Sequence, residues 1–234
     1  MKAMILAAGR GERLRPLTDS QPKPMIEVGG KPLILHHIEN LAHNGFKEIV
    51  INLAYLGDTI ADYLGDGHQY GVSIEYSRED SALETAGGIA TALPMLGEQP
   101  FIVVNGDIWT DYAFAKLSLH ENHLAHLVMV QNPVHHPMGD FGLNTQRALS
   151  KKVYQLGQSY ERKFTFSGIG CYHPRLFKNC KPNQSMKLAP LLLQAMESEQ
   201  VSGEMFQGRW IDVGTPERLR EAMTLADFID QQLD

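Results

Sequence analysis

The sequence predicts an α/β protein with a mixed, mostly parallel central sheet flanked by helices. Three observations support this fold class. Short apolar runs alternate with segments of helical spacing through the first half of the chain. The first apolar run ends in a turn rich in glycine. Between residues 141 and 172 the strand-like segments are more irregular, so we expect part of the sheet to be antiparallel.

The elements follow from these patterns in chain order. The first half predicts strands at 3–8, 47–53, 72–76 and 101–105, and helices at 33–44, 56–64 and 85–96. Gly45 is a typical helix stop after the first of these helices. The second half predicts strands at 124–131, 141–144, 152–156, 164–172 and 210–213, and helices at 188–196 and 216–229. No repeat or linker is visible, so we expect a single domain over residues 1–234.

Composition limits the possible functions. The 234 residues are 43% hydrophobic, enough for a sizeable core, and the net charge of −6 argues against a nucleic-acid partner. No apolar stretch approaches the ~20 residues that span a bilayer. No signal peptide is evident, and Cys171 and Cys180 do not form a C-x-x-C pair. We therefore expect a cytoplasmic protein without a membrane partner, present as a monomer or weak homo-oligomer.

The turn after the first strand suits a polyphosphate. Gly9 and Gly11 allow backbone N–H groups to face an anion, and the arginines beside them offer paired donors to phosphate oxygens. A dinucleotide-binding fingerprint fails on spacing, because position 14 is Leu where glycine or alanine is required. Lys23 follows between two prolines that stiffen the backbone, as a compact charge for a reacting phosphate.

Two carboxylates, one after a short apolar run and one within another, are candidate metal ligands. Asp107 follows the strand at 101–105, and Asp212 lies within the apolar segment 210–213. Mg²⁺ is commonly held by one or two carboxylates with waters and substrate phosphates. Zinc is not favoured, because His36 and His37 are helix neighbours that point to different faces and no zinc-ligand spacing is visible.

Residues 6–24 resemble the signature of the sugar-1-phosphate nucleotidyltransferases, L-A-A-G-x-G-x-R-L-x-P-L-T followed by P-K-P, at every fixed position. The resemblance covers the whole chain and implies the Rossmann-like fold of nucleotide-diphospho-sugar transferases. It implies UTP and a sugar 1-phosphate as substrates and Mg²⁺ as cofactor, bound by Asp107 and Asp212. It implies catalytic roles for Arg13 and Lys23. The implied nucleotide-binding residues are Ala8, Gly9, Gly11, Glu12, Arg13, Lys23, Glu84, Gly87 and Gly88, and the implied sugar-binding residues are Asn105, Asp140 and Gly142.

Segments 133–141, 165–169, 187–191 and 201–204 resemble the branch of this family that joins UTP and N-acetylmuramate α-1-phosphate in peptidoglycan recycling. A glucose-1-phosphate thymidylyl- or uridylyltransferase is the alternative within the same chemistry. A non-catalytic subunit that senses nucleotide sugars is the alternative from another class. The intact Arg13, Lys23, Asp107 and Asp212 favour an enzyme.

The expected reaction needs no general base. The attacking group is a phosphomonoester whose second pKa is about 6, so it is largely ionised at neutral pH. The obstacle is to bring this dianion against a polyanion. Positioning and charge neutralisation must therefore provide most of the catalysis.

Overall fold

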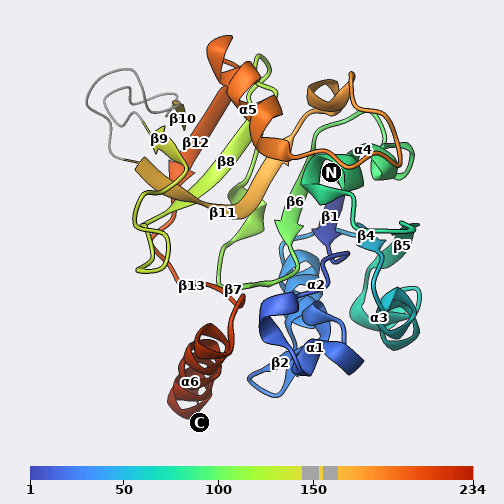
Figure 1. Ribbon diagram of the computed structural model, residues 1–234, viewed down its shortest axis with the longest axis vertical. Helices are drawn as coiled ribbons and strands as arrows, with labels where there is room; N and C mark the ends of the chain where they lie inside the picture. The colour runs from blue at the N-terminus through green and yellow to red at the C-terminus, as the bar shows by residue number, and fades with distance from the viewer. Residues whose placement is uncertain (144–152, 155–162, 234) are drawn as a thin grey trace.

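A computed structural model describes residues 1–143, 153–154 and 163–233. Within these residues the main sheet has nine strands, and its longest path runs β10-β9-β11-β6-β1-β4-β5, with β8 paired to β11 and β12 paired to β8 (Figure 1). The strands are β1 (Ala3–Leu6), β4 (Glu48–Leu53), β5 (Ser73–Arg78), β6 (Phe101–Asn105), β8 (Ala125–Val130), β9 (Phe141–Leu143), β10 (Val153–Tyr154), β11 (Lys163–Tyr172) and β12 (Val201–Met205).

The sheet is parallel in one half and mixed in the other. Strands β1, β4, β5 and β6 are parallel to one another, whereas β11 runs antiparallel to β6, β8 and β9. The predicted mixed, mostly parallel α/β fold is therefore confirmed.

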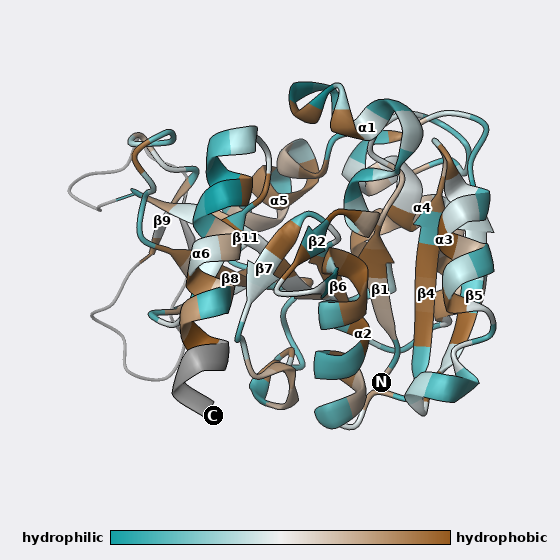
Figure 2. Cartoon of the chain, turned by 90° about the horizontal axis from the view of Figure 1, so that it is seen from below, coloured by the Kyte–Doolittle hydropathy of each residue, from teal (hydrophilic) through white to brown (hydrophobic). Residues whose placement is uncertain are grey.

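Helices cover both faces of the sheet. They are α1 (Leu17–Ser20), α2 (Leu33–His43), α3 (Gly57–Leu64), α4 (Glu84–Leu96), α5 (Leu188–Glu197) and α6 (Pro216–Leu233). Apolar side chains of α2 and α3 share one buried cluster with Ala3 and Ile5 of β1, and those of α4 and α5 share another with Met4. A strand buried on both faces reads as a continuous apolar run, and Figure 2 shows β1 and β4 brown over most of their length.

Shorter elements complete the fold. Two small ribbons pair β2 (Glu27–Val28) with β3 (Lys31–Pro32) and β7 (Ile108–Thr110) with β13 (Trp210–Asp212). Helix α6 packs beside them in a third apolar cluster. The described part of the chain also forms five 3-10 helices, η1 (Glu12–Leu14), η2 (Lys23–Met25), η3 (His68–Tyr70), η4 (Phe114–Lys116) and η5 (Pro174–Phe177).

The predicted elements lie where the sequence placed them, with ends that differ by a few residues. Residue 144 of the strand expected at 141–144 lies outside the described residues, as do 152, 155 and 156 of the strand expected at 152–156. The sequence did not predict α1, β2, β3, β7 or β12, which are short or take their extended form from a partner strand.

A crevice forms where the chain changes direction within the sheet. After β1 the chain builds β4 and β5 on one side, then returns to place β6 on the other side. Ligands of open α/β sheets bind at such a point, beyond the carboxyl ends of the strands. Leu6 and Asn105 end the paired strands in register, and Gly106 N–H donates to the Leu6 carbonyl at 2.9 Å. A Cβ at Gly106 would lie 2.6 Å from that oxygen, so this turn requires glycine.

No helix within the described residues combines the length and apolar character needed to cross a membrane.

Candidate active site

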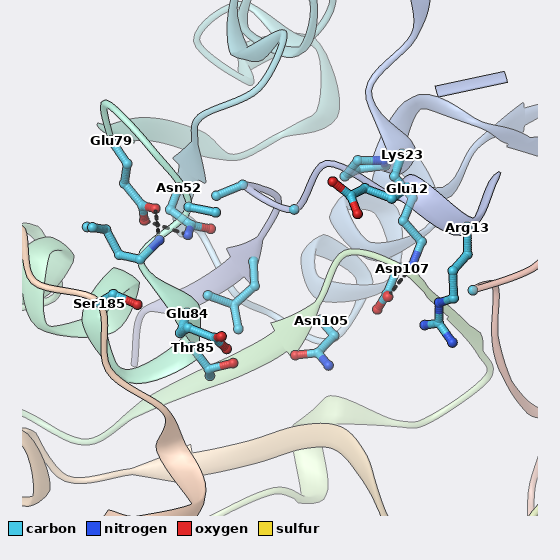
Figure 3. A pocket seen from close by; sticks show the side chains of 18 residues that line it. Glu12, Arg13, Lys23, Asn52, Glu79, Glu84, Thr85, Asn105, Asp107 and Ser185 are labelled. Carbon is cyan, nitrogen blue, oxygen red and sulfur yellow. Dashed lines mark hydrogen bonds and ion pairs between the residues drawn. The ribbon is translucent and has the colours of Figure 1, made fainter. Parts of the chain in front are cut away.

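A cavity of about 690 Å³ opens at the crevice between β1 and β6. Figure 3 shows its lining side chains in two groups, with Lys23, Glu12, Arg13 and Asp107 at one end, Asn52, Glu79, Glu84, Thr85 and Ser185 at the other, and Asn105 between them. The cations of the lining, Arg13 and Lys23, therefore stand together at one end of the described cavity.

The loop after β1 forms one wall of this cavity. Gly11 has a left-handed φ of +71°, and a Cβ there would lie 3.0 Å from the Cβ of Lys23. Gly11 therefore allows η1 and η2 to meet closely. A Cβ at Gly9, in contrast, would meet no protein atom within 4 Å. Gly9 leaves open space on the cavity wall, where a ligand can approach the backbone.

Lys23 and Asp107 form an ion pair at the cationic end. The distance from Lys23 Nζ to Asp107 Oδ2 is 2.5 Å, and the lysine side chain is only 10% exposed (Figure 3). Lys23 reaches the cavity from η2, whereas Asp107 follows β6. Low exposure strengthens this charge pair relative to one in water, so Lys23 is held in a defined position beside the cavity.

The ribbon of β7 and β13 brings Asp212 next to Asp107. Asp212 pairs with Ile108 across the ribbon, and the N–H of Val213 donates to the backbone carbonyl of Asp107 at 2.8 Å. Arg218 Nη1 donates to Asp212 Oδ2 at 2.5 Å. The other carboxylate oxygen, Asp212 Oδ1, is buried and has no hydrogen-bond partner among the described residues.

This arrangement fits a hard cation that substrate phosphates help to hold. A buried carboxylate oxygen without a donor suits a metal ligand, and Asp107 supplies a second carboxylate from the turn between β6 and β7. Among the described residues no group of three or more His, Cys, Asp or Glu side chains converges as a metal cage. Two carboxylates are nevertheless a typical protein contribution to a Mg²⁺ site.

The opposite end of the cavity rests on a buried amide and a buried carboxyl group. Asn52 accepts a hydrogen bond from the N–H of Ala7 at 2.9 Å and donates one to Glu79 Oε1 at 2.7 Å. Burial raises the pKa of Glu79. Sequence analysis missed both residues, although Asn52 is a polar residue near the carboxyl end of the apolar strand β4. The strand-end rule that selected Asp107 would have found Asn52 too.

Gly87 and Gly88 lie behind this end rather than on the cavity wall. A Cβ at Gly87 would be 2.3 Å from the backbone oxygen of Gln184, and one at Gly88 would be 2.8 Å from both Asn52 Nδ2 and Glu79 Oε1. The two glycines therefore allow α4 to pack against the residues that do line the cavity.

A second cavity of about 340 Å³ continues from the first. The two share Arg13, Asn105 and Asp107. The remaining wall of the second cavity comes from β7, the loop before β9, β11, β13 and the start of α6. It consists of Ile108, His135, His136, Thr165, Phe166, Ser167, Gly168, Trp210, Asp212 and Arg218.

Asp140 lies outside both cavities and ties the loop before β9 to β11. Its Oδ2 accepts from the N–H of Phe166 at 2.8 Å, and its own N–H donates to the Phe164 carbonyl at 2.8 Å. Its Oδ1 lies 3.1 Å from His136 Nε2. Gly142 is also outside the cavities, as a buried residue of β9. Asp140 thus positions a wall of the second cavity.

The structure therefore gathers most of the predicted site residues at one crevice. The predicted site residues that line the first cavity are Ala8, Gly9, Gly11, Glu12, Arg13, Lys23, Glu84, Asn105 and Asp107. Asp212 lines the second cavity. The residues that sequence analysis missed include Asn52, Glu79, Ser185, His135, Gly214 and Arg218.

The protein combines an α/β sheet with a glycine-rich, cationic loop at the crevice of that sheet, and two carboxylates lie across the crevice from the loop. These features are typical of nucleotide-binding transferases. A family model for nucleotidyl transferases matches residues 2–227, and the chain therefore belongs to the nucleotidyl transferase family. Together with the relatives below, this makes it a sugar-1-phosphate nucleotidyltransferase.

Individual relatives agree with this family. The chain is 52% identical over 232 residues to the N-acetylmuramate alpha-1-phosphate uridylyltransferase of Neisseria meningitidis serogroup B, covering 97% of this chain and 98% of that one. It is 32% identical over 230 residues to the mannose-1-phosphate guanylyltransferase catalytic subunit beta of Dictyostelium discoideum, covering 96% of this chain and 64% of that longer protein.

A solved structure shows the same fold. It comes from Bacillus anthracis, is provisionally assigned as a glucose-1-phosphate thymidylyltransferase and was crystallised with sucrose. The TM-score is 0.81 at 22% identity, with 97% of this chain and 95% of that chain covered.

Proposed function

We propose that this protein transfers the uridylyl group of UTP to N-acetylmuramate α-1-phosphate, releasing pyrophosphate and forming UDP-N-acetylmuramate for peptidoglycan recycling. The observation that carries the choice of nucleotide and sugar is the similarity, over nearly the full length of both chains, to a uridylyltransferase of that name. The geometry supports nucleotidyl transfer independently of that name.

The distribution of charge sets the direction of the nucleotide in the first cavity. Arg13 and Lys23 stand at one end, whereas Asn52, Glu79 and the start of α4 at the other end offer no lysine or arginine to the cavity. We place the triphosphate beside the two cations and the base beside α4. In this arrangement the triphosphate lies along Ala8, Gly9, Gly11 and Glu12. The base lies beside Glu84, with Gly87 and Gly88 behind that residue.

The sugar 1-phosphate occupies the second cavity, so that its phosphate meets UTP at the shared residues Arg13, Asn105 and Asp107. Asn105 contacts the sugar in this arrangement, and Asp140 and Gly142 support the wall around it.

In the reaction, an oxygen of the sugar phosphate attacks the α-phosphorus of UTP. A new P–O bond forms as the bond to the pyrophosphate oxygen breaks, and pyrophosphate leaves with the bonding electrons. Arg13 and Lys23 stabilise the negative charge that develops around the phosphorus and the leaving group. No proton must be removed, because the attacking phosphate is already ionised.

Asp107 and Asp212 would hold Mg²⁺ at the junction of the two cavities. When bound, Mg²⁺ would neutralise phosphate charge and draw the two anions together. Both carboxylates already have cationic partners, since Lys23 pairs with Asp107 and Arg218 with Asp212. These two ion pairs therefore hold the carboxylates of Asp107 and Asp212 near the junction without help from the metal.

The remaining expectations about the whole molecule are also proposals. We propose one nucleotidyltransferase domain over residues 1–234, cytoplasmic and present as a monomer or weak homo-oligomer. The family match over residues 2–227 supports a single domain.

A pyrophosphate-release assay tests the function. Purified protein is supplied with each of UTP, dTTP, GTP and ATP against N-acetylmuramate, N-acetylglucosamine, glucose and mannose 1-phosphates. We expect the highest kcat/KM with UTP and the muramate substrate. A preference for glucose 1-phosphate with dTTP, or mannose 1-phosphate with GTP, would overturn the choice of substrates. Absence of pyrophosphate release in all combinations would overturn nucleotidyl transfer itself.

A further inference from the structure

Arg218 is a buried arginine that lines the second cavity. The nucleotidyl transfer proposed above gives it no contact with a substrate. It is the third residue of α6, and its side chain is only 9% exposed. Its Nη1 lies 2.5 Å from Asp212 Oδ2 and 2.6 Å from His135 Nε2. Its Nε is buried and has no hydrogen-bond partner among the described residues. The Nε donor is therefore unused within the described residues, on a side chain that also lines the second cavity.

Gly214 makes room for this guanidinium. A Cβ at position 214 would lie 2.2 Å from Arg218 Nη2 and 3.0 Å from an Nη of Arg13. Two guanidinium groups thus approach the same small space, with Asp212 Oδ1 also 2.7 Å from that Cβ position. Concentrated positive charge of this kind is stable only with anions close by.

The anion beside Arg218 in the structure is the carboxylate of Asp212. If Asp212 binds Mg²⁺ through its unpartnered Oδ1, as proposed above, its single negative charge is shared between the cation and Arg218. The guanidinium then has less of its counter-ion. A buried charge without a counter-ion is strongly destabilising. A substrate that arrives with a negative group of its own would restore the balance.

The position of Arg218 indicates which negative group this is. In the proposed arrangement the phosphates of both substrates meet at the shared part of the two cavities, which includes Arg13. Lys23 lines only the first cavity, and Arg218 and His135 line only the second. Nε and one Nη form the edge of a guanidinium that binds a carboxylate through two parallel hydrogen bonds. A sugar that bears an acidic substituent brings such a carboxylate.

We propose that Arg218, with His135 beside it, binds the carboxylate of an acidic substituent on the sugar 1-phosphate and so selects acidic over neutral sugars. The proposal rests on the proposed function, in which that substituent is the lactyl group of N-acetylmuramate. Arg218 is then a specificity-determining residue. The chemical step itself remains with the residues at the shared junction.

The test compares two sugars that differ by the lactyl group. The kcat/KM values for N-acetylmuramate and N-acetylglucosamine 1-phosphates with UTP are measured for the wild type, Arg218→Gln, Arg218→Lys and Arg220→Gln. Arg220 is the matched control, because it lies on the same helix, is exposed and pairs with Glu217. In Arg218→Gln we expect the ratio of muramate to glucosamine kcat/KM to fall by at least about tenfold, since a buried ion pair with the substrate is lost. Arg220→Gln should leave the ratio unchanged.

Other outcomes separate this inference from the proposed function. An equal loss for both sugars in Arg218→Gln would show that Arg218 serves Asp212 or the phosphate, and would overturn the inference. Should Arg218→Gln fail to fold, Arg218→Lys keeps the charge but not the paired donors, and an unchanged ratio in it would likewise count against the proposal. Calorimetric binding of each sugar phosphate without UTP gives a readout that needs no turnover. The wild type could bind the muramate substrate without turning it over, and the Arg218→Gln variant could lose that binding. This pair of results would support the role of Arg218 in binding the carboxylate and would refute the proposed function.

Discussion

His37 makes the stability of this protein depend on pH, because the folded chain buries its imidazole and lowers the pKa of that group. Its side chain lies in α2, fully buried against the main sheet, and burial lowers its pKa to about 4, with the neighbouring His36 adding to the effect. In the unfolded chain the same imidazole has its ordinary pKa of about 6.5. The perturbation is therefore acidification from pH 7.5 to pH 4, in the wild type and in His37→Gln.

The sign follows from which state binds the proton. Above pH 6.5 the imidazole is neutral in both states and contributes no pH dependence. Between pH 6.5 and 4 the unfolded chain takes up a proton that the folded protein excludes, so folding becomes less favourable as the pH falls. Each pH unit is worth at most about 1.4 kcal/mol, which gives a total of about 3 kcal/mol over the interval.

Urea unfolding at several pH values measures this effect. The free energy of unfolding of the wild type should fall more steeply between pH 6.5 and 4 than that of His37→Gln, with a difference near 3 kcal/mol by pH 4. His68→Gln removes an exposed histidine and should follow the wild type. Parallel curves for the wild type and His37→Gln would refute the reasoning, because they would show that His37 takes up a proton equally in both states.

Three further predictions concern the site. Asp107→Asn or Asp212→Asn should keep the fold by circular dichroism but nearly abolish pyrophosphate release and weaken Mn²⁺ binding in electron paramagnetic resonance titrations; near-normal turnover at saturating Mg²⁺ would contradict the metal assignment. Lys23→Ala should lower kcat by about 10²–10³ as one preorganised charge is removed, and a change confined to KM in steady-state kinetics would make Lys23 a ground-state binder. Gly87→Ala should destabilise the protein by about 1–3 kcal/mol in urea unfolding, because its Cβ meets a backbone oxygen 2.3 Å away. Gly9→Ala should leave stability unchanged and raise the KM for UTP, and equal stability loss in the two glycine variants would disprove this distinction.

The parts of the fold that sequence predicted are those whose local pattern and burial agree. The segment of α2 has helical spacing and ends near Gly45, and β6 is an apolar run buried on both faces. Strand β12 has no such pattern, since it includes Ser202, Gly203 and Glu204. It becomes a strand because it pairs in parallel with β8, and a contact between distant segments leaves no local trace.

The same distinction applies to the candidate site. Gly9, Gly11 and Lys23 lie in one contiguous segment, so their spacing carried the prediction. Arg218 is in an amphipathic helix, where an arginine ordinarily faces solvent, and only the packing of α6 against β13 shows that it is buried. Asp140 was predicted to contact the sugar and that role stays a prediction, while its observed hydrogen bonds are to β11 and His136.

Among the residues that the structure describes, the two cavities share three, Arg13, Asn105 and Asp107, and this has an evolutionary consequence. In the proposed arrangement, mutations in the loop before β9 or at the start of α6 reshape the second cavity, which takes the sugar, while most of the wall of the first cavity, which takes the nucleotide, is unchanged. In the same arrangement, changes around Asn52 and α4 affect the part of the first cavity proposed for the base and leave the second cavity unchanged. Under the proposed function, the two substrate preferences can therefore change separately during evolution. The same separation makes the loop at residues 131–140 a natural unit to exchange when new sugar nucleotides are to be synthesised with this scaffold.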